Sequence, residues 1–279
     1  MLRSLYSGVS GMKSQQTRLD VISNNIANAN TIGFKSSRAN FSDILSQTTA
    51  NASGPRATVG GIDGKQVGLG VQVGAIDTDM GQGIQNTTGR ALDLYINGSG
   101  FLVFERDGNN GQVYSRNGAL KIDANGNLTN ADGLRVMGYA PGQEGGALTP
   151  ITVPAQNAAG EKLVEGHVSI GPDGKVTARY GAEDEVIGTV SIATFSNPAG
   201  LSKIGNSTYE ISQDSGNANN LVPGTDGTNT LLAGTLEDSN VDLAQEFSDM
   251  IVTSRAYQAN ARSITTSDEM LQELINLKR

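Results

Sequence analysis

Apolar residues within residues 1–33 recur every three or four positions, which is the spacing of one face of a helix. The pattern predicts an N-terminal helix with a continuous apolar stripe. This stripe comprises Leu2, Leu5, Val9, Met12, Leu19 and Ile26, with the polar residues Gln16 and Ser23 at the same spacing. We expect the helix to end within NNIANAN, after which Gly33 can adopt a positive φ angle and turn the chain.

The stretch NNIANAN places asparagine, a poor helix former, beside Ile22 and Ile26, which keep a helical spacing. One interpretation is that the asparagines hydrogen-bond to neighbouring backbone or amide groups and fix the register of packed helices. The other interpretation is a fraying helix end that faces water. The asparagines concerned are Asn24, Asn25, Asn28 and Asn30.

Residues 235–279 repeat the helical spacing over several heptads, which predicts a C-terminal helix that pairs with the N-terminal helix as a coiled coil. Asp238, Ser239 or Asn240 is expected to cap the start of this helix, with Asp242 in its first turn. Each helix could instead pack on its own domain, but both stripes lie far from the middle of the chain. The second stripe comprises Leu243, Phe247, Met250, Tyr257, Ala261, Ile264, Leu271 and Ile275, with Ser254 and Asp268 as polar members.

The middle of the chain changes to alternating apolar residues and turn sequences. ALDLYI and FLVFE, separated by NGSG, are typical of two strands joined by a turn, and GPDGK indicates a further hairpin. Most of the 36 glycines and all seven prolines lie in this middle part. We therefore expect a mainly β protein with long α-helical termini: an N-terminal helix (1–33), an extended connector (34–88), an antiparallel β domain (89–234) and a C-terminal helix (235–279).

Charge and composition exclude several classes of function. The net charge of −8 argues against nucleic acid as a partner, and no apolar run approaches the roughly 20 residues that membrane insertion requires. The absence of cysteine excludes disulfides and thiolate chemistry. The start MLRSLYSGVSGMKSQQ lacks the continuous apolar segment of a cleavable signal peptide, so any export is expected to use another route.

Candidate catalytic and metal-binding motifs are weak. His167 is the single histidine, and the chain has neither G-x-S-x-G nor a cysteine to complete a nucleophilic triad around it. DANGNLTNADGL starts like a calcium loop, but Leu128 and Leu134 occupy the positions that require glycine and glutamate. We therefore expect no enzyme activity, no cofactor and no metal site.

A single pair of such terminal helices would be marginally stable in water, because the conformational entropy lost on ordering it offsets what burying one stripe contributes. The two helices therefore need further neighbours. Copies of the same chain are the simplest source of such neighbours, and head-to-tail contacts between copies would produce a filament.

Three segments of the sequence resemble known motifs. SLYSGVSGMKSQQTRLDVISNNIANANTIGFK is similar to the N-terminal signature of the bacterial flagellar rod and hook family, TTGRALDLYINGSGFLVF to the motif at the start of its β domain, and NVDLAQEFSDMIVTSRAYQANARSITTSDEMLQELINL to its C-terminal helix. The resemblance implies a secreted, self-assembling axial protein whose paired terminal helices line an inner tube. It also favours a packed role for NNIANAN.

Within this family, GFKSSRANFSDILSQT resembles the hook protein of Gram-positive bacteria. This resemblance implies a flexible coupling that transmits motor torque to the filament. The alternative within the family is the distal rod protein, a rigid drive shaft. A secreted β-rich adhesin or binding module is an alternative of a different class, and it would not need apolar stripes at both ends.

The resemblance implies that the partners are further copies in a helical tube, the distal rod protein, the hook cap, the hook–filament junction proteins and the flagellar type III export apparatus. The implied location is extracellular, in the hook of the basal body–hook complex, after export without a cleavable signal peptide. The residues expected to carry self-assembly are Leu5, Val9, Met12, Leu19, Ile22, Asn25, Ile26, Asn28, Phe247, Met250, Tyr257, Ile264, Leu271 and Ile275.

Overall fold

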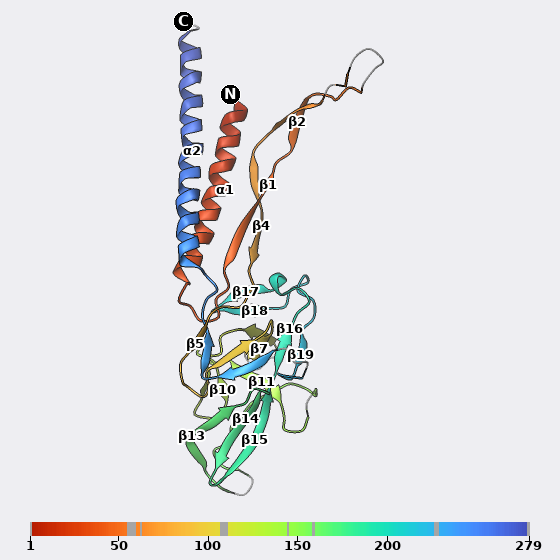
Figure 1. Cartoon of the computed structure of the whole chain (residues 1–279), viewed down its shortest axis with the longest axis vertical. Coiled ribbons are helices and arrows are strands. Elements are labelled where there is room, and N and C mark those ends of the chain that lie inside the picture. Colours follow the sequence, from red (N-terminus) through yellow and green to blue (C-terminus); the bar gives the residue numbers. More distant parts are fainter. Residues whose placement is uncertain are drawn as a thin grey trace. The chain divides into compact units, whose positions relative to one another are not determined.

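A computed structural model describes residues 2–54, 60–61, 63–106, 111–143, 145–157, 160–225 and 229–277 (Figure 1). The protein is mostly β, with antiparallel sheets and an α-helix near each end, which confirms the predicted fold class at this level. A coiled-coil geometry between the helices stays a prediction. The chain divides into two compact units: unit 1 comprises Met1–Ala27, Ser37–Thr78 and Asp242–Arg279, and unit 2 comprises Asn28–Ser36 and Asp79–Val241.

The N-terminal helix α1 (Leu2–Ala27) ends inside NNIANAN, as the sequence predicts. Beyond it, the backbone N–H of Thr31 donates to the carbonyl of Asn28 at 3.1 Å, and Gly33 has a φ angle of +67°. This confirms the positive φ predicted for Gly33. A side chain there would also clash, because an added Cβ would lie 2.9 Å from the backbone carbon of Arg116.

The C-terminal helix α2 (Leu243–Asn276) begins at a cap that the sequence analysis misplaced. Asp242 is the N-cap, and its Oδ1 accepts the backbone N–H groups of Ala244 (2.9 Å) and Gln245 (3.3 Å). The expected caps Asp238, Ser239 and Asn240 precede the helix in unit 2. The prediction was wrong because those side chains already have partners there: Asn240 Oδ1, for example, accepts the N–H of Ser36 at 2.8 Å. Within the described residues, neither helix is both long and apolar enough to cross a lipid bilayer.

Two antiparallel strand pairs complete unit 1. The first joins β1 (Ser37–Asp43) to β4 (Val71–Thr78), with a register shift between Asn40 and Phe41. The second joins β2 (Ser46–Ala50) to β3 (Lys65–Gly68), and every side chain in these two strands is exposed.

One residue of β4 attaches this ribbon to α1. The N–H of Val71 donates to Ser10 Oγ, and the carbonyl of Val71 accepts from Ser14 Oγ, both at 3.4 Å. The neighbouring Gly70, with φ +130°, permits this approach because an added Cβ would lie 2.3 Å from Ser10 Oγ. Ser10, Ser14 and Gly70 therefore help to hold β4 against α1.

Within its described residues, unit 2 is built around a sheet of 13 strands, whose main path has the order β13-β14-β15-β11-β7-β8-β18-β17. Its strands are β7 (Phe101–Arg106), β8 (Gly111–Ser115), β9 (Lys121–Ile122), β10 (Leu128–Thr129), β11 (Arg135–Tyr139), β12 (Thr149–Pro150), β13 (Leu163–Ile170), β14 (Lys175–Tyr180), β15 (Glu183–Val190), β16 (Ile192–Thr194), β17 (Ser202–Gly205), β18 (Thr208–Glu210) and β19 (Asn219–Leu221). A short 3₁₀ helix, η1 (Pro198–Gly200), precedes β17.

Two further strand pairs bring the end of unit 2 back to its beginning. β5 (Gln85–Thr87) pairs with β21 (Thr235–Glu237), and β6 (Leu94–Asn97) pairs with β20 (Thr230–Ala233). Unit 2 therefore needs the last residues of its own sequence to complete its sheets.

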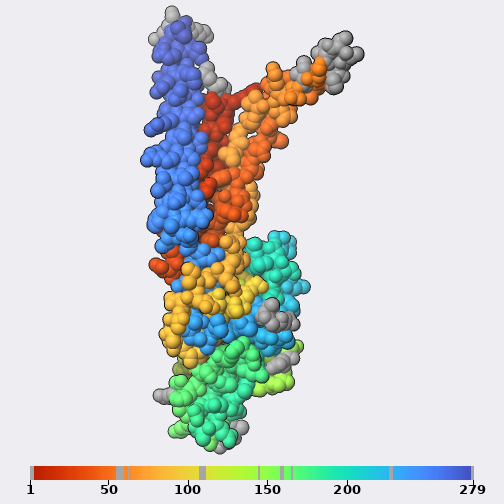
Figure 2. Space-filling view, in the orientation of Figure 1, coloured from red at the N-terminus to blue at the C-terminus, as the bar shows by residue number. Residues whose placement is uncertain are grey.

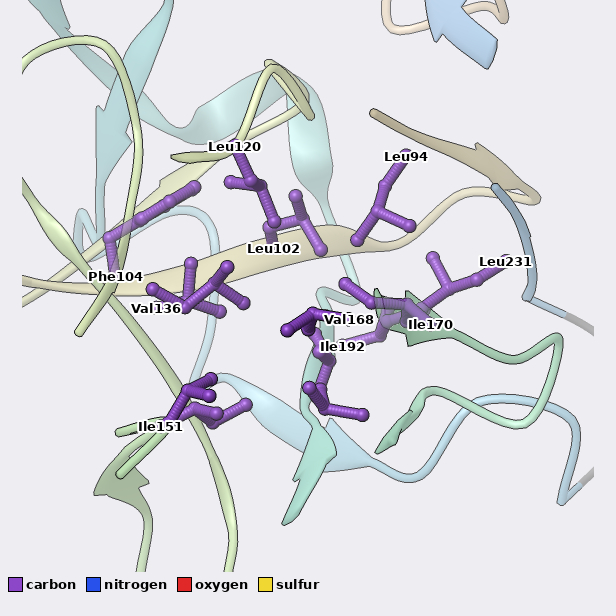
Figure 3. Packing of buried hydrophobic residues seen from close by; sticks show 14 of the residues in the cluster. Leu94, Leu102, Phe104, Leu120, Val136, Ile151, Val168, Ile170, Ile192 and Leu231 are labelled. Carbon is purple, nitrogen blue, oxygen red and sulfur yellow. The ribbon is translucent and has the colours of Figure 1, made fainter. Parts of the chain in front are cut away.

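The central strand β7 is apolar at four consecutive positions because both of its faces are buried. Leu102 and Phe104 belong to one apolar cluster, which also receives side chains from β11 and β16 (Figure 3). Phe101 and Val103 belong to a second cluster, in which the Phe101 ring packs edge-on against Tyr209 with a centroid distance of 5.7 Å. The FLVFE run predicted as a strand therefore lies between two cores.

Burial raises the pKa of Tyr114 and the pKa of Tyr209 to about 12, from an ordinary value of 10.0. The unfolded chain releases these protons near the ordinary pKa. The stability they contribute is therefore complete below that value and is lost as the pH rises through the folded pKa. We expect the free energy of unfolding to fall by roughly 2 kcal/mol per tyrosine across this alkaline window, as measured by urea denaturation at a series of pH values.

Two substitutions test the cause of this decline. Tyr209→Phe should remove part of it, whereas Tyr6→Phe, at a side chain that is 72% exposed, should leave it unchanged. An alkaline decline that is as large in Tyr209→Phe as in the unmodified chain would contradict the assignment.

Candidate assembly interface

The two helices of unit 1 run antiparallel and contact each other (Figure 1). Ser4 Oγ lies 3.3 Å from Ser267 Oγ near one end of the contact, and Asn25 Nδ2 donates to Glu246 Oε1 (3.0 Å) at the other. We call this contact the helix seam. It comprises Ser4, Gly8, Gly11, Arg18 and Asn25 of α1 with Glu246, Asp249, Asn260, Ile264 and Ser267 of α2.

Two glycines let the helices approach closely in the middle of the helix seam. A Cβ added at Gly8 would lie 2.9 Å from Ile264 Cγ1, and one added at Gly11 would lie 2.7 Å from Asn260 Nδ2. Both distances are shorter than an ordinary van der Waals contact, so any side chain there would push the helices apart or displace the partner side chain. Glycine is a poor helix former, so Gly8 and Gly11 weaken α1 by itself, and the close packing of α1 against α2 offsets this cost.

Asn25 closes the helix seam and is only 2% exposed. Its side chain exchanges two hydrogen bonds with the backbone of Ser37, at 2.9 Å to the carbonyl and 3.0 Å from the N–H. Its amide also donates to Glu246, whose pKa is raised by burial, while this hydrogen bond opposes the rise. Asn28, by contrast, accepts from Thr31 Oγ1 in a local turn. Asn25 therefore joins the end of α1, the start of β1 and the first turn of α2.

Most residues of the helix seam are small or polar, so the predicted α1 stripe does not coincide with it. Among the expected assembly residues, Ile22 and Asn25 are buried, while Val9 is 51% exposed. The others are half-buried: Leu5, Met12, Leu19 and Ile26 in α1, and Asn28 beyond the end of α1.

The predicted α2 stripe is divided in the same way. Ile264 belongs to the helix seam, and Met250 and Leu271 are likewise half-buried. Tyr257, Phe247 and Ile275 remain 38%, 50% and 67% exposed. The structure therefore brings only part of each stripe to the other helix.

The sequence analysis missed a second apolar face on α2, which lies outside the predicted stripe. Figure 2 shows α2 (blue) beside α1 (red), with a flank of α2 that α1 does not cover. Near its C-terminal end, this face forms a shallow groove of about 480 Å³ that includes Met270, Leu274 and Leu277. The exposed apolar residues of this face are Ile251, Val252, Met270, Leu274 and Leu277, and on α1 Tyr6 is likewise exposed outside its stripe. A search for one stripe of fixed spacing could not find them, because they occupy a different side of the helix.

Paired helices with uncovered apolar faces, attached to an antiparallel β unit, are typical of a subunit that assembles with other proteins. Among the described residues, no three His, Cys, Asp or Glu side chains are grouped so that they could hold a metal ion. The fold and this surface are those of a subunit with apolar faces available to other proteins.

Three family models match the chain. "Flagella basal body rod protein" matches residues 5–35, "Flagellar hook protein FlgE/F/G D1 domain" matches residues 95–178, and "Flagellar basal body rod FlgEFG protein C-terminal" matches residues 232–277. The chain belongs to the flagellar rod and hook family of axial proteins.

Relatives of both types match along their whole length. The flagellar basal-body rod protein FlgG of Bacillus subtilis (strain 168) is 48% identical over 283 residues, with 100% of both chains covered. The protein of the same name from Borreliella burgdorferi is 37% identical over 284 residues, again with 100% of both covered. The flagellar hook protein FlgE of Borreliella burgdorferi is 28% identical over 443 residues, also with 100% of both covered.

These comparisons favour a rod protein over a hook protein. The sequence had instead predicted a hook protein, and that prediction is corrected here. That expectation rested on GFKSSRANFSDILSQT, whereas the motifs at the two ends belong to rod and hook proteins alike. The discriminating feature is length: the rod alignments have nearly the length of this chain of 279 residues, and the hook alignment is far longer.

Replacing Asn25 by alanine tests the hydrogen bonds that Asn25 makes at the end of the helix seam. The change removes three hydrogen bonds and leaves the polar groups of Ser37 and Glu246 without these partners. We expect the free energy of unfolding to fall by about 2 kcal/mol, even though alanine is the better helix former. Urea denaturation followed by the helical circular-dichroism signal measures this change.

Asn30→Ala is the matched control because Asn30 is exposed and lies beyond α1. It should change the free energy of unfolding by less than about 0.5 kcal/mol. Equal effects of the two substitutions would show that Asn25 has no special role.

Proposed function

We propose that the protein is a subunit of the distal flagellar rod, the rigid shaft that passes motor torque to the hook. The supporting observation is the 48% identity to the rod protein FlgG of Bacillus subtilis with both chains fully covered. In this proposal, copies of the chain form a helical tube whose neighbours along the axis are other rod proteins and the hook protein. The flagellar type III export apparatus delivers each copy.

In the proposed tube, residues 1–33 and 235–279 form the inner layer, residues 34–88 connect it outward and residues 89–234 form the outer β domain. The helix seam is one coiled-coil contact, and neighbouring copies cover the remaining apolar faces. The contacts between copies use the uncovered members of the two stripes, including Val9, Phe247 and Ile275. Burying such side chains supplies roughly 25 cal/mol per Å² of apolar surface, which favours association.

Rigidity follows from the kind of surface that is buried. Large apolar contacts fix one arrangement, whereas shallow polar contacts permit sliding between several. The exposed side chains of β2 and β3 offer an additional surface to a neighbouring copy, so each subunit can be held at more than its helices.

Electron microscopy of basal bodies from a strain that lacks this protein distinguishes the rod from the hook. The proposal predicts truncated rods that carry no hook, since the hook is built on the distal rod. Complete rods without hooks would instead identify a hook subunit. Intact flagella would exclude both functions.

Ile275→Asp tests the apolar faces directly. Ile275 is 67% exposed, so the substitution should leave the thermal unfolding midpoint of the single chain within a few degrees. Its charge would be buried without a partner in the tube, so assembly should be lost. Sedimentation velocity and negative-stain microscopy measure assembly.

The matched control is Asn276→Asp, which places the same charge at the next exposed position of α2. We expect this variant to assemble like the unmodified chain. Tubes formed equally by both variants would mean that Ile275 does not lie between copies.

A further inference from the structure

Three charged side chains lie together inside unit 2, where the proposed assembly surface does not reach. Lys35 and Glu237 are fully buried, and Arg116 is 2% exposed. Lys35 Nζ lies 2.6 Å from Glu237 Oε1, and Arg116 Nη1 lies 3.2 Å from Glu237 Oε2. One carboxylate therefore serves two buried cations. We call Lys35, Arg116 and Glu237 the buried triad.

Backbone groups around the buried triad supply further hydrogen bonds, while the buried Arg116 Nε has no hydrogen-bond partner among the described residues. Lys35 Nζ also donates to the carbonyl of Gly81, and Arg116 Nη2 donates to the carbonyl of Gly98, both at 2.6 Å. Glu237 Oε1 accepts the N–H of Gly83 at 2.8 Å. The site has no room for rearrangement, because a Cβ added at Gly83 would lie 1.9 Å from the carbonyl oxygen of Asp238.

The buried triad joins segments that are distant in the sequence. Glu237 lies 202 positions after Lys35 and 121 positions after Arg116. The same segments share backbone contacts: the N–H of Gly33 donates to the carbonyl of Glu237 at 2.8 Å, and the N–H of Asp79 donates to the carbonyl of Ser36 at 2.8 Å. Closing this part of unit 2 therefore requires residues from nearly the whole length of the chain.

Lys35 and Arg116 can be buried at low cost only when the carboxylate of Glu237 lies beside them. Burial alone lowers the pKa of Lys35, because a charged amine loses its hydration, and the charge of Glu237 acts in the opposite direction. Removing one member of a buried ionic group strongly destabilises a fold, whereas replacing all members by apolar residues of similar size is often neutral or stabilising. The fold would therefore be destabilised most if Lys35 and Arg116 were buried without the carboxylate of Glu237.

We propose that the buried triad is a closure lock that holds back the completion of unit 2 until the segment carrying Glu237 reaches Lys35 and Arg116. The charges remain hydrated before that step and must lose water together during it. Closure is therefore slow, and once made it is held by the full set of contacts. The lock prevents an incomplete chain from reaching a compact form.

The function of such a lock rests on the proposed export through the flagellar apparatus. A subunit that passes through a narrow channel must stay unfolded on the way. A folding step that depends on the last strand of unit 2, β21, keeps the earlier strands from closing too soon. The same three side chains would then stabilise the folded subunit in the finished rod and slow its folding before assembly.

Refolding kinetics of the full chain test the lock. The variant with Lys35→Met, Arg116→Met and Glu237→Leu removes the charges but keeps the apolar volume, so we expect it to refold about tenfold faster than the unmodified chain. Glu237→Gln leaves two cations without their carboxylate. It should speed unfolding strongly while leaving the refolding rate nearly unchanged, because loss of water by the charges is the rate-limiting step and the contacts of Glu237 form only after it. Stopped-flow fluorescence or circular dichroism measures both rates.

The control replaces an ion pair elsewhere in unit 2 that is near the surface. Arg135 Nη2 lies 2.8 Å from Glu105 Oε2, and the Arg135 side chain is 39% exposed. Arg135→Met with Glu105→Leu should not refold faster than the unmodified chain. A triple variant of the buried triad that refolds no faster than this control would overturn the proposal.

The single variant decides the case if the triple variant does not fold. An effect of Glu237→Gln that falls mainly on unfolding supports formation of the Glu237 contacts after the rate-limiting loss of water, and one that falls mainly on refolding overturns the proposal. In cells, the triple variant should be exported less than the unmodified chain although its unfolding midpoint is at least as high. Absence of flagellar export of the unmodified chain would refute the proposed function, but the kinetic result would stand by itself.

Discussion

The close approach of α1 and α2 depends on the absence of side chains at Gly8 and Gly11, and the rest of the account follows from this constraint. Most residues of the helix seam are small or polar, and such side chains bring two backbones near each other with little apolar surface between them. The larger apolar residues must therefore lie beside the helix seam or away from it, where water reaches them. The small and polar residues of the helix seam thus allow the two helices to pair and also leave apolar faces of the helices free for other chains.

Unit 2 is stabilised by different interactions from those of the helix seam. Its two apolar clusters, on either face of β7, provide the stability of an ordinary antiparallel β protein. The buried triad adds little apolar burial, but it requires Lys35 and Glu237, from the two ends of the unit, to meet in one arrangement. Apolar packing tolerates many arrangements, whereas a shared carboxylate accepts few. The chain thus combines a permissive surface for assembly with a specific contact inside the subunit.

Local patterns in the sequence were sufficient to predict elements but not their contacts. The helical spacing predicted both helices, and the glycine after NNIANAN predicted the turn at Gly33. The helix seam was not predictable from hydrophobic spacing, because that analysis selects large apolar residues and the close contact uses small ones. The buried triad was hidden by sequence separation, although a lysine directly after the apolar TIGF could have suggested a buried cation. The cap at Asp242 was missed by two to four residues because three other polar residues precede it.

Solvent access to the uncovered helix faces tests the central claim most directly. The chain contains no cysteine, so Phe247→Cys or Ile275→Cys introduces a single thiol at a position that is exposed in the lone subunit. The rate of maleimide labelling should be high in the separated subunit and should fall sharply once copies have assembled. Labelling that is equally fast in both states would show that these faces stay in water and that assembly depends on another surface.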